Sequence, residues 1–263
     1  MPLPAPPAPV PASAPVPAPA PTAAGLTLLH VDRELVAIDK PAGLLVHPSA
    51  LDAHETVTAL DLLAERLGAR PWPLHRLDKG TSGVLLFARD AAAAGRWRRA
   101  FEEGRVRKRY VALVRGWPAA SGEIDAPLAR DPERPSAGRP LLPALTRWRR
   151  LARHEWPFAV DGRHPTSRYA LVEVEPVTGR RHQIRRHFKR LAHPLVGDAT
   201  HGKGAHNRAA AAWLGVSRLW LHAESLSIDG GPDGAGALRI DAPRGAEWAR
   251  LGEPVGEDGA AGA

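Results

Sequence analysis

The chain has 263 residues, enough to bury a sizeable core in one large domain or two small ones. Its formal net charge of +8 predicts a polyanionic partner, and nucleic acid fits best because no apolar membrane-binding segment accompanies the charge. The chain contains no cysteine, which excludes disulfides, a thiol nucleophile and a Cys-ligated zinc site and is consistent with a reducing, cytoplasmic location.

The two ends of the chain differ in composition from the rest. The first 22 residues contain ten prolines and no charged side chain, a density of proline that favours extended, unpacked conformations. Residues 1–24 are therefore predicted to be a disordered tail, and residues 25–250 the folded domain. Residues 251–263, rich in Gly, Ala and acids, are predicted to be a shorter flexible tail.

Hydrophobic periodicity and turn residues predict short strands and helices in the first half of the domain. These elements are a hairpin of strands at 26–31 and 35–40, a helix from Thr56 to Gly68 with Val57, Leu60, Leu63 and Leu67 on one face, and a helix from its N-cap Asp90 to Gly104 that exposes Arg96, Arg98 and Arg99.

Between these two helices lies the stretch 74–89, which reads Leu-His-Arg-Leu-Asp-Lys-Gly-Thr-Ser-Gly-Val-Leu-Leu-Phe-Ala-Arg. Its acid, Asp78, separates two apolar runs and is followed by turn-forming residues, which predicts a strand, a tight turn and a buried strand at 84–88. An acid held on a turn between core strands is well placed for chemistry. An aspartate in a turn more often caps its own backbone, so both interpretations stay open here.

The second half is predicted to contain further strands, a long loop and two helices. The predicted elements are strands at 108–116, 144–151, 168–175, 219–224 and 238–241, a loop at 129–143, a basic helical segment at 179–190 and a short helix capped by Asn207. In the third of these strands Ala170, Val172 and Val174 share one face. Hairpins with scattered helices predict an α+β domain rather than regular βαβ units.

The segment 179–190 is the most basic part of the chain, with six cations and no acid. On a helical wheel it has one apolar face, made of Ile184, Phe188 and Leu191, with Arg181 and Arg185 at its border and Arg186 and Arg190 pointing away. An arginine at such a border can reach into a half-buried site. If Asp78, Tyr110 and Arg185 meet, the arginine favours the charged carboxylate, and the tyrosine offers a stacking face and a hydroxyl.

Other chemistries have weaker support. Ser82 lacks the strand-to-helix elbow of a hydrolase nucleophile. The histidines lack the one-turn spacing of a helical zinc site, and no phosphate loop of the Walker or dinucleotide type occurs. The sequence therefore predicts neither a metal nor a cofactor.

Four segments in the same order and spacing, at 39–47, 75–88, 108–116 and 178–202, resemble the motifs of the RluA-type pseudouridine synthases. The resemblance covers about residues 25–241. It implies the pseudouridine synthase fold, an α+β domain with a long mixed, largely antiparallel sheet, flanking helices and a central cleft for RNA. It also implies an isomerase that flips a uridine out of RNA and exchanges its C–N glycosidic bond for a C–C bond, without cofactor.

Carried over residue by residue, the resemblance implies that Asp78 is the catalytic aspartate, Tyr110 the active-site tyrosine and Arg185 the basic partner of the aspartate. Arg76 matches the arginine that enters the RNA. The remaining cations expected to face phosphates are Arg181, Arg186 and Lys189.

Three further segments, at 164–169, 179–187 and 202–208, resemble members that modify uridine 65 of tRNA. The predicted substrate is therefore that uridine, with ribosomal RNA, or RNA binding without catalysis, as the alternatives. A monomer with no membrane contact and no protein partner is expected.

Overall fold

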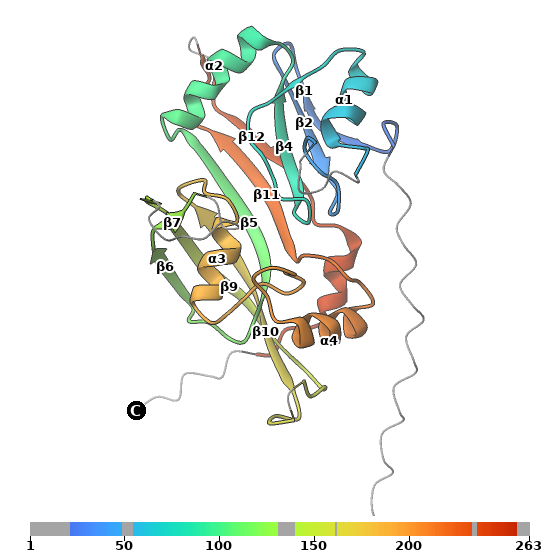
Figure 1. Cartoon of the computed structure of the whole chain (residues 1–263), viewed down its shortest axis with the longest axis vertical. Helices are drawn as coiled ribbons and strands as arrows, with labels where there is room; N and C mark the ends of the chain where they lie inside the picture. The colour runs from blue at the N-terminus through green and yellow to red at the C-terminus, as the bar shows by residue number, and fades with distance from the viewer. Residues whose placement is uncertain (1–21, 49–54, 131–139, 161, 233–235, 257–263) are drawn as a thin grey trace, which may run out of the picture.

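The computed structural model describes residues 22–48, 55–130, 140–160, 162–232 and 236–256 (Figure 1). The predicted N-terminal tail up to residue 21, most of the loop predicted at 129–143, and the last seven residues lie outside the described residues. Among the described residues no helix has the length and apolar character needed to cross a membrane.

A ten-stranded sheet forms the frame of the molecule, with the path β1-β2-β4-β11-β5-β10-β9-β6, while β12 pairs with β11 and β3 with β4. All its pairings are antiparallel except β4 with β11. The strands are β1 Thr27–Val31, β2 Leu35–Lys40, β3 Trp72–Pro73, β4 Ser82–Ala88, β5 Val106–Arg115, β6 Ser121–Asp125, β9 Leu145–Trp156, β10 Ser167–Pro176, β11 Leu221–Ile228 and β12 Leu238–Asp241. The short strands β7 Leu128–Ala129 and β8 Leu141–Leu142 form a separate pair. The predicted α+β arrangement with a mixed, largely antiparallel sheet is confirmed.

Helices cover both faces of this sheet. They are α1 Ala59–Leu67, α2 Ala91–Glu102, α3 Gln183–Arg190, α4 Gly204–Leu214 and the 3-10 helix η3 Ala246–Leu251. Alternate residues of each strand point to opposite faces, so Tyr110 packs in one hydrophobic cluster with α1 and α3, whereas Val111 packs in another with α4 and η3. A third cluster packs α2 against β2, β4, β11 and β12, at the opposite end of the molecule from α4 (Figure 1).

Two helix starts differ from the prediction. Helix α1 begins after Thr58, whose hydroxyl accepts a hydrogen bond from the backbone N–H of Asp61, and Val57 lies outside the helix with 41% of its surface exposed. Asn207 lies inside α4 rather than at its cap. Its side chain bonds instead to the backbone of Gly197 and Asp198, which fixes the loop before the helix.

The stretch around Asp78 also differs from the prediction, because residues 74–81 form a loop rather than a strand. The Leu86 backbone N–H donates to the imidazole Nε2 of His75. In a regular strand pair, a backbone carbonyl of the neighbouring strand would accept this hydrogen bond. The tight turn is present, since the Thr81 N–H donates to the Asp78 carbonyl at 3.0 Å. The strand that follows, β4, is buried along its whole length, as predicted.

The folded part of the chain extends into the predicted C-terminal tail. Leu251 is buried at the end of η3, and the Val255 N–H donates to the Arg153 carbonyl at 2.8 Å. The residues beyond 256 lie outside the described part.

The parallel contact between β4 and β11 depends on Gly83. Its φ of 108° is unfavourable for any other residue, and a Cβ atom there would lie 2.2 Å from the Ala223 carbonyl oxygen. We expect Gly83→Ala to lower the free energy of unfolding by about 3 kcal/mol or more in urea denaturation. Gly43→Ala, at a φ of 90° with no atom within 4 Å, is the matched control and should cost only about 1–2 kcal/mol. Equal losses in the two variants would contradict the steric explanation.

Candidate active site

Asp78 and Arg185, 107 positions apart in the chain, form a direct ion pair. The Arg185 Nη1 donates to the Asp78 Oδ2 at 2.9 Å. Asp78 comes from the loop between β3 and β4, and Arg185 from the first turn of α3, beside the apolar contacts of Ile184. The proximity predicted for these two residues is therefore observed.

A second carboxylate holds the other side of the same guanidinium. Arg185 donates through Nε and Nη2 to the two oxygens of Asp198, at 2.7 and 2.9 Å. Asp198 also accepts hydrogen bonds from the backbone N–H groups of Thr200 and His201. Because Asp198 is held by these backbone groups and itself binds two nitrogens of Arg185, the guanidinium is fixed in the orientation that meets Asp78.

Electrostatics keep this network charged. Burial by itself lowers the pKa of Arg185, but the hydrogen bonds and charges of Asp198 and Asp78 raise it above its ordinary value. Burial opposes the ionisation of Asp198, yet the Arg185 hydrogen bonds lower the pKa of that carboxyl below its ordinary value. The pair Arg185–Asp198 is thus a charged, rigid support for Asp78.

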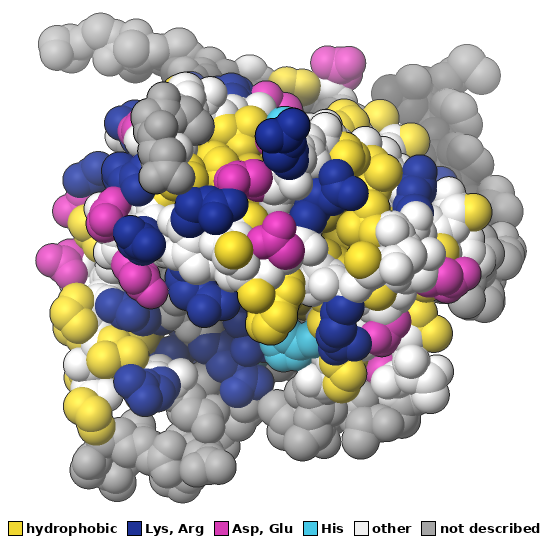
Figure 2. Space-filling model, turned by 90° about the horizontal axis from the view of Figure 1, so that it is seen from above, with side chains coloured by type: hydrophobic (Ala, Val, Ile, Leu, Met, Phe, Trp, Pro, Cys, Tyr) yellow, Lys and Arg dark blue, Asp and Glu magenta, His cyan; other side chains and the backbone are white. Residues whose placement is uncertain are grey.

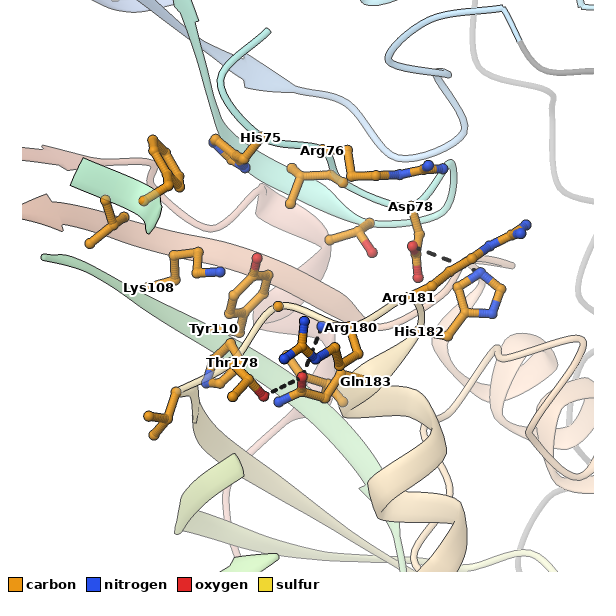
Figure 3. A pocket seen from close by; sticks show the side chains of 18 of the residues that line it. His75, Arg76, Asp78, Lys108, Tyr110, Thr178, Arg180, Arg181, His182 and Gln183 are labelled. Carbon is orange, nitrogen blue, oxygen red and sulfur yellow. Dashed lines mark hydrogen bonds and ion pairs between the residues drawn. The ribbon is translucent and has the colours of Figure 1, made fainter. Parts of the chain in front are cut away.

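Tyr110 lies on β5 with its hydroxyl directed into the space that Asp78 also faces (Figure 3). Burial, reinforced by the negative charge of Asp78, raises the pKa of Tyr110 well above its ordinary value. The hydroxyl is therefore protonated at neutral pH and is available as a hydrogen-bond or proton donor rather than as a base.

One histidine lies beside Asp78 and a second contacts the first, although the sequence patterns did not single out either for this site. The His182 Nε2 is 3.8 Å from the Asp78 Oδ1, too far for a hydrogen bond, and its Nδ1 is 3.2 Å from the His201 Nε2. Burial lowers the pKa of His182 to about 4, so this imidazole is neutral at neutral pH. His182 has a positive φ of 53°, the backbone conformation that turns the chain into α3.

The buried side chain of Lys40 holds the loop that carries Asp78 through hydrogen bonds. Its Nζ donates to the backbone carbonyls of Pro41, Leu44 and Lys79, at 2.8, 2.8 and 3.1 Å. The last of these acceptors belongs to the residue directly after Asp78. Lys40 therefore ties β2 to the backbone of the loop that carries Asp78.

Lys40 gives the stability of the protein a defined pH dependence. Burial lowers its pKa from 10.5 to about 7, so between these values the unfolded chain binds more protons than the folded one. This contribution to the free energy of unfolding rises with pH across that window. We expect Lys40→Met to flatten the rise, measured by urea denaturation at several pH values. Lys189→Met, at an exposed lysine, should keep the wild-type slope, and equal slopes in all three proteins would contradict the assignment.

Two pockets, of about 620 and about 440 Å³, adjoin at Asp78 and together make a cleft. Both are lined by Arg76, Asp78, Arg181, His182 and Arg185, and the larger one also by Tyr110. Figure 2 shows Lys and Arg side chains gathered around a hollow on one face of the molecule. The volume suits a nucleotide, and the charge suits a phosphate backbone.

Comparison with known proteins identifies the family of the chain. The sequence model described as RNA pseudouridylate synthase matches residues 34–190, more than half of the chain. The chain belongs to the RNA pseudouridylate synthase family.

Curated relatives and solved structures agree with this family membership. The chain is 42% identical over 206 residues to a tRNA pseudouridine synthase C of Vibrio cholerae, covering 76% of this chain and 84% of that protein. It is 43% identical over 212 residues to a tRNA pseudouridine synthase C of Pasteurella multocida, with the same coverage. The structure of human RNA pseudouridylate synthase domain containing 1 superimposes with a TM-score of 0.68 at 26% identity, covering 86% of each chain.

Not all the cations predicted to bind RNA line the cleft. Arg76 is exposed and extends over the cleft beside Asp78, and Arg181 lines both pockets (Figure 3). Arg186 and Lys189 line neither pocket. Arg186 does not simply point away, as the helical wheel predicted, because its Nη1 donates to the Ala129 carbonyl at 2.9 Å. The helix begins only at Gln183, so Arg181 precedes it and is not part of the helical wheel.

Three residues around Asp78 and Arg185 were not predicted from the sequence, because their sequence context gives little indication of a role at this site. Asp198 and His201 occur in a polar stretch after α3 that contains several glycines, but nothing in their spacing indicates that they support Arg185. Lys40 directly follows an aspartate in a β-prone run, where a solvated lysine is the ordinary expectation. Only the folded chain shows that its ammonium group is fully buried.

Proposed function

We propose that this chain converts a uridine of tRNA into pseudouridine, and that the target is uridine 65. Membership of the RNA pseudouridylate synthase family supports the reaction, and the likeness to proteins named tRNA pseudouridine synthase C supports tRNA as the substrate. The observation that carries the proposal is the Asp78–Arg185 ion pair at the junction of two cationic pockets.

The target nucleotide must leave the RNA stack before Asp78 can reach it, which costs a few kcal/mol. Arg76 is the exposed cation at the rim of the cleft, and we assign to it the role of filling the vacated place and holding the extruded nucleotide. Arg181 lies across the cleft and supplies charge for the flanking phosphates.

The chemical step then exchanges one bond for another. The bond from uracil N1 to ribose C1′ breaks, the base turns, and its C5 joins C1′, while C5 loses one proton and N1 gains one. Positive charge develops at the ribose as such a glycosidic bond loosens. The Asp78 carboxylate, oriented by Arg185, is the group that acts on the substrate, and the protonated Tyr110 supplies a donor and a ring on which the base stacks.

The loss of the C5 hydrogen provides a direct assay. A tRNA transcript labelled with tritium at C5 of its uridines should release one equivalent of tritium to water for each modified site. A transcript in which uridine 65 is replaced by cytidine is the matched control and should release none. Release from both transcripts would place the activity on another uridine. Binding without release from any tRNA or ribosomal RNA would leave only an RNA-binding protein.

A further inference from the structure

A third pocket, of about 560 Å³, lies away from the catalytic cleft. Arg115 lines it, and this residue follows Val111 and Leu113 at even spacing on β5, so its side chain leaves the sheet on the face covered by α4. Tyr110 is on the opposite face, five residues earlier, which separates the two sites by roughly 17 Å along the strand. The pocket therefore lies at the end of β5, on the face of the sheet opposite to Tyr110.

Arg115 is a cation that lacks a partner of its own. It is half-buried in this pocket, and no hydrogen bond or ion pair joins its guanidinium to any residue in the described part of the chain. A guanidinium that is partly removed from water and has no ion pair within the protein gains stability from an outside anion that can reach it. The pocket is therefore suited to an anionic ligand.

A second guanidinium in the same pocket is held in a fixed position. The Arg168 side chain stacks over the Trp117 ring at 4.2 Å from its centroid, and its Nε lies 3.4 Å from the Glu155 Oε1. Glu155 also accepts a hydrogen bond from the Thr166 hydroxyl. The one acid of the pocket is thus already engaged by groups around it, and Arg168 is oriented for a planar, bidentate contact.

Two segments that the sequence analysis singled out meet here. Residues 164–168 line the pocket together with His206 of the segment 202–208. The hydroxyl of Tyr169, the last residue of the first segment, is 3.1 Å from the His206 Nδ1. These are segments whose resemblance to tRNA-modifying enzymes was noted from the sequence, yet neither lines the cleft around Asp78. Their meeting at one pocket favours a role in choosing the RNA rather than in chemistry.

The chain itself connects this pocket to the catalytic site. His201 contacts His182 beside Asp78, and His206 lines the third pocket only five residues later, at most about 17 Å away. Between and after them, Lys203 and Arg208 are exposed at the start of α4. A path of two exposed cations therefore leads from the cleft, past the ends of the central strands, towards Arg115.

We propose that the third pocket and this path bind a sugar–phosphate segment of the substrate tRNA remote from the target uridine. The inference rests on the proposed function, because it takes tRNA as the ligand. The two guanidinium groups of Arg115 and Arg168 provide donors for phosphate oxygens, and such contacts are how proteins fix the register of a nucleic acid. An RNA must be long enough to reach from the catalytic cleft to the third pocket to occupy both sites. The remote contact therefore favours a whole tRNA over a short hairpin.

The test compares two RNAs on three proteins. The RNAs are a full-length tRNA transcript and a hairpin that contains only the target uridine and its flanking base pairs. The proteins are wild type, Arg115→Gln and the control Arg239→Gln, which removes the same charge at an exposed position on β12. Dissociation constants are measured by fluorescence anisotropy over a range of salt concentrations, and circular dichroism checks that each variant is folded.

Arg115→Gln should weaken binding of the full-length tRNA about fivefold or more and reduce its salt slope by about one, while its hairpin affinity stays within about twofold of wild type. The control should bind both RNAs like wild type. Equal losses on both RNAs, or no loss on either, would overturn the inference. An acidic peptide as the true ligand would give the second outcome.

Failure of the inference can be told apart from failure of the proposed function. If wild type releases tritium but Arg115→Gln binds tRNA normally, only the remote contact is wrong. If no RNA is modified but Arg115→Gln still loses affinity selectively for tRNA, only the catalytic assignment is wrong.

Discussion

Replacing Asp78 with asparagine is expected to abolish pseudouridine formation, lowering turnover by about 10⁴-fold or more. The amide has nearly the same shape and can still accept the Arg185 hydrogen bond at 2.9 Å, but it carries no negative charge and is a far weaker nucleophile and base. Tritium release from C5-labelled tRNA measures the loss. Affinity for tRNA should stay within about twofold, because one carboxylate contributes little to a phosphate-dominated contact.

Asp241→Asn is the matched control for this experiment. Asp241 is an exposed acid at the end of β12, paired with Arg239, and its conversion to an amide removes the same charge at a residue that lines neither pocket of the cleft. We expect wild-type turnover in this variant. Turnover within about tenfold of wild type in Asp78→Asn would show that another group performs the chemistry.

The second large effect is expected at Arg185. Arg185→Lys keeps the charge but loses the planar fork that binds both Asp78 and Asp198, so Asp78 is no longer held in one orientation. We expect turnover at saturating tRNA to fall about 10²-fold with affinity nearly unchanged. Arg185→Ala goes further, because it leaves the fully buried carboxylate of Asp198 unpaired, and should lower the free energy of unfolding by about 3–5 kcal/mol.

Arg186, the next residue of α3, provides the contrast. Its guanidinium reaches the Ala129 carbonyl rather than Asp78, so Arg186→Ala should reduce tRNA affinity more than turnover. Single-turnover kinetics with enzyme in excess over tRNA, repeated at several enzyme concentrations, separate the two quantities. The assigned division of roles is wrong if Arg185→Lys and Arg186→Ala change turnover and affinity in the same proportion.

Much of the fold could be predicted from local patterns. The hairpin at the start of the domain, the helix capped by Asp90 and the shared face of Ala170, Val172 and Val174 are all observed, because each depends on neighbours close in sequence. The predictions that differ from the structure failed where a distant residue intervenes. Asn207 is not a cap because Gly197 and Asp198 use its side chain, and residues 74–77 are not a strand because His75 serves as the acceptor for Leu86.

The sequence by itself determined the motifs, their order and the residue types they bring, which was enough to predict the family and the pairing of Asp78 with Arg185. Only the tertiary structure decided what surrounds that pair. Asp198 holds Arg185, and Lys40 ties down the loop after Asp78, across separations of 13 and 39 residues. The third pocket likewise exists only where β5, β10 and α4 meet. The physical reason is that burial and hydrogen bonding belong to positions in space, which a one-dimensional pattern does not contain.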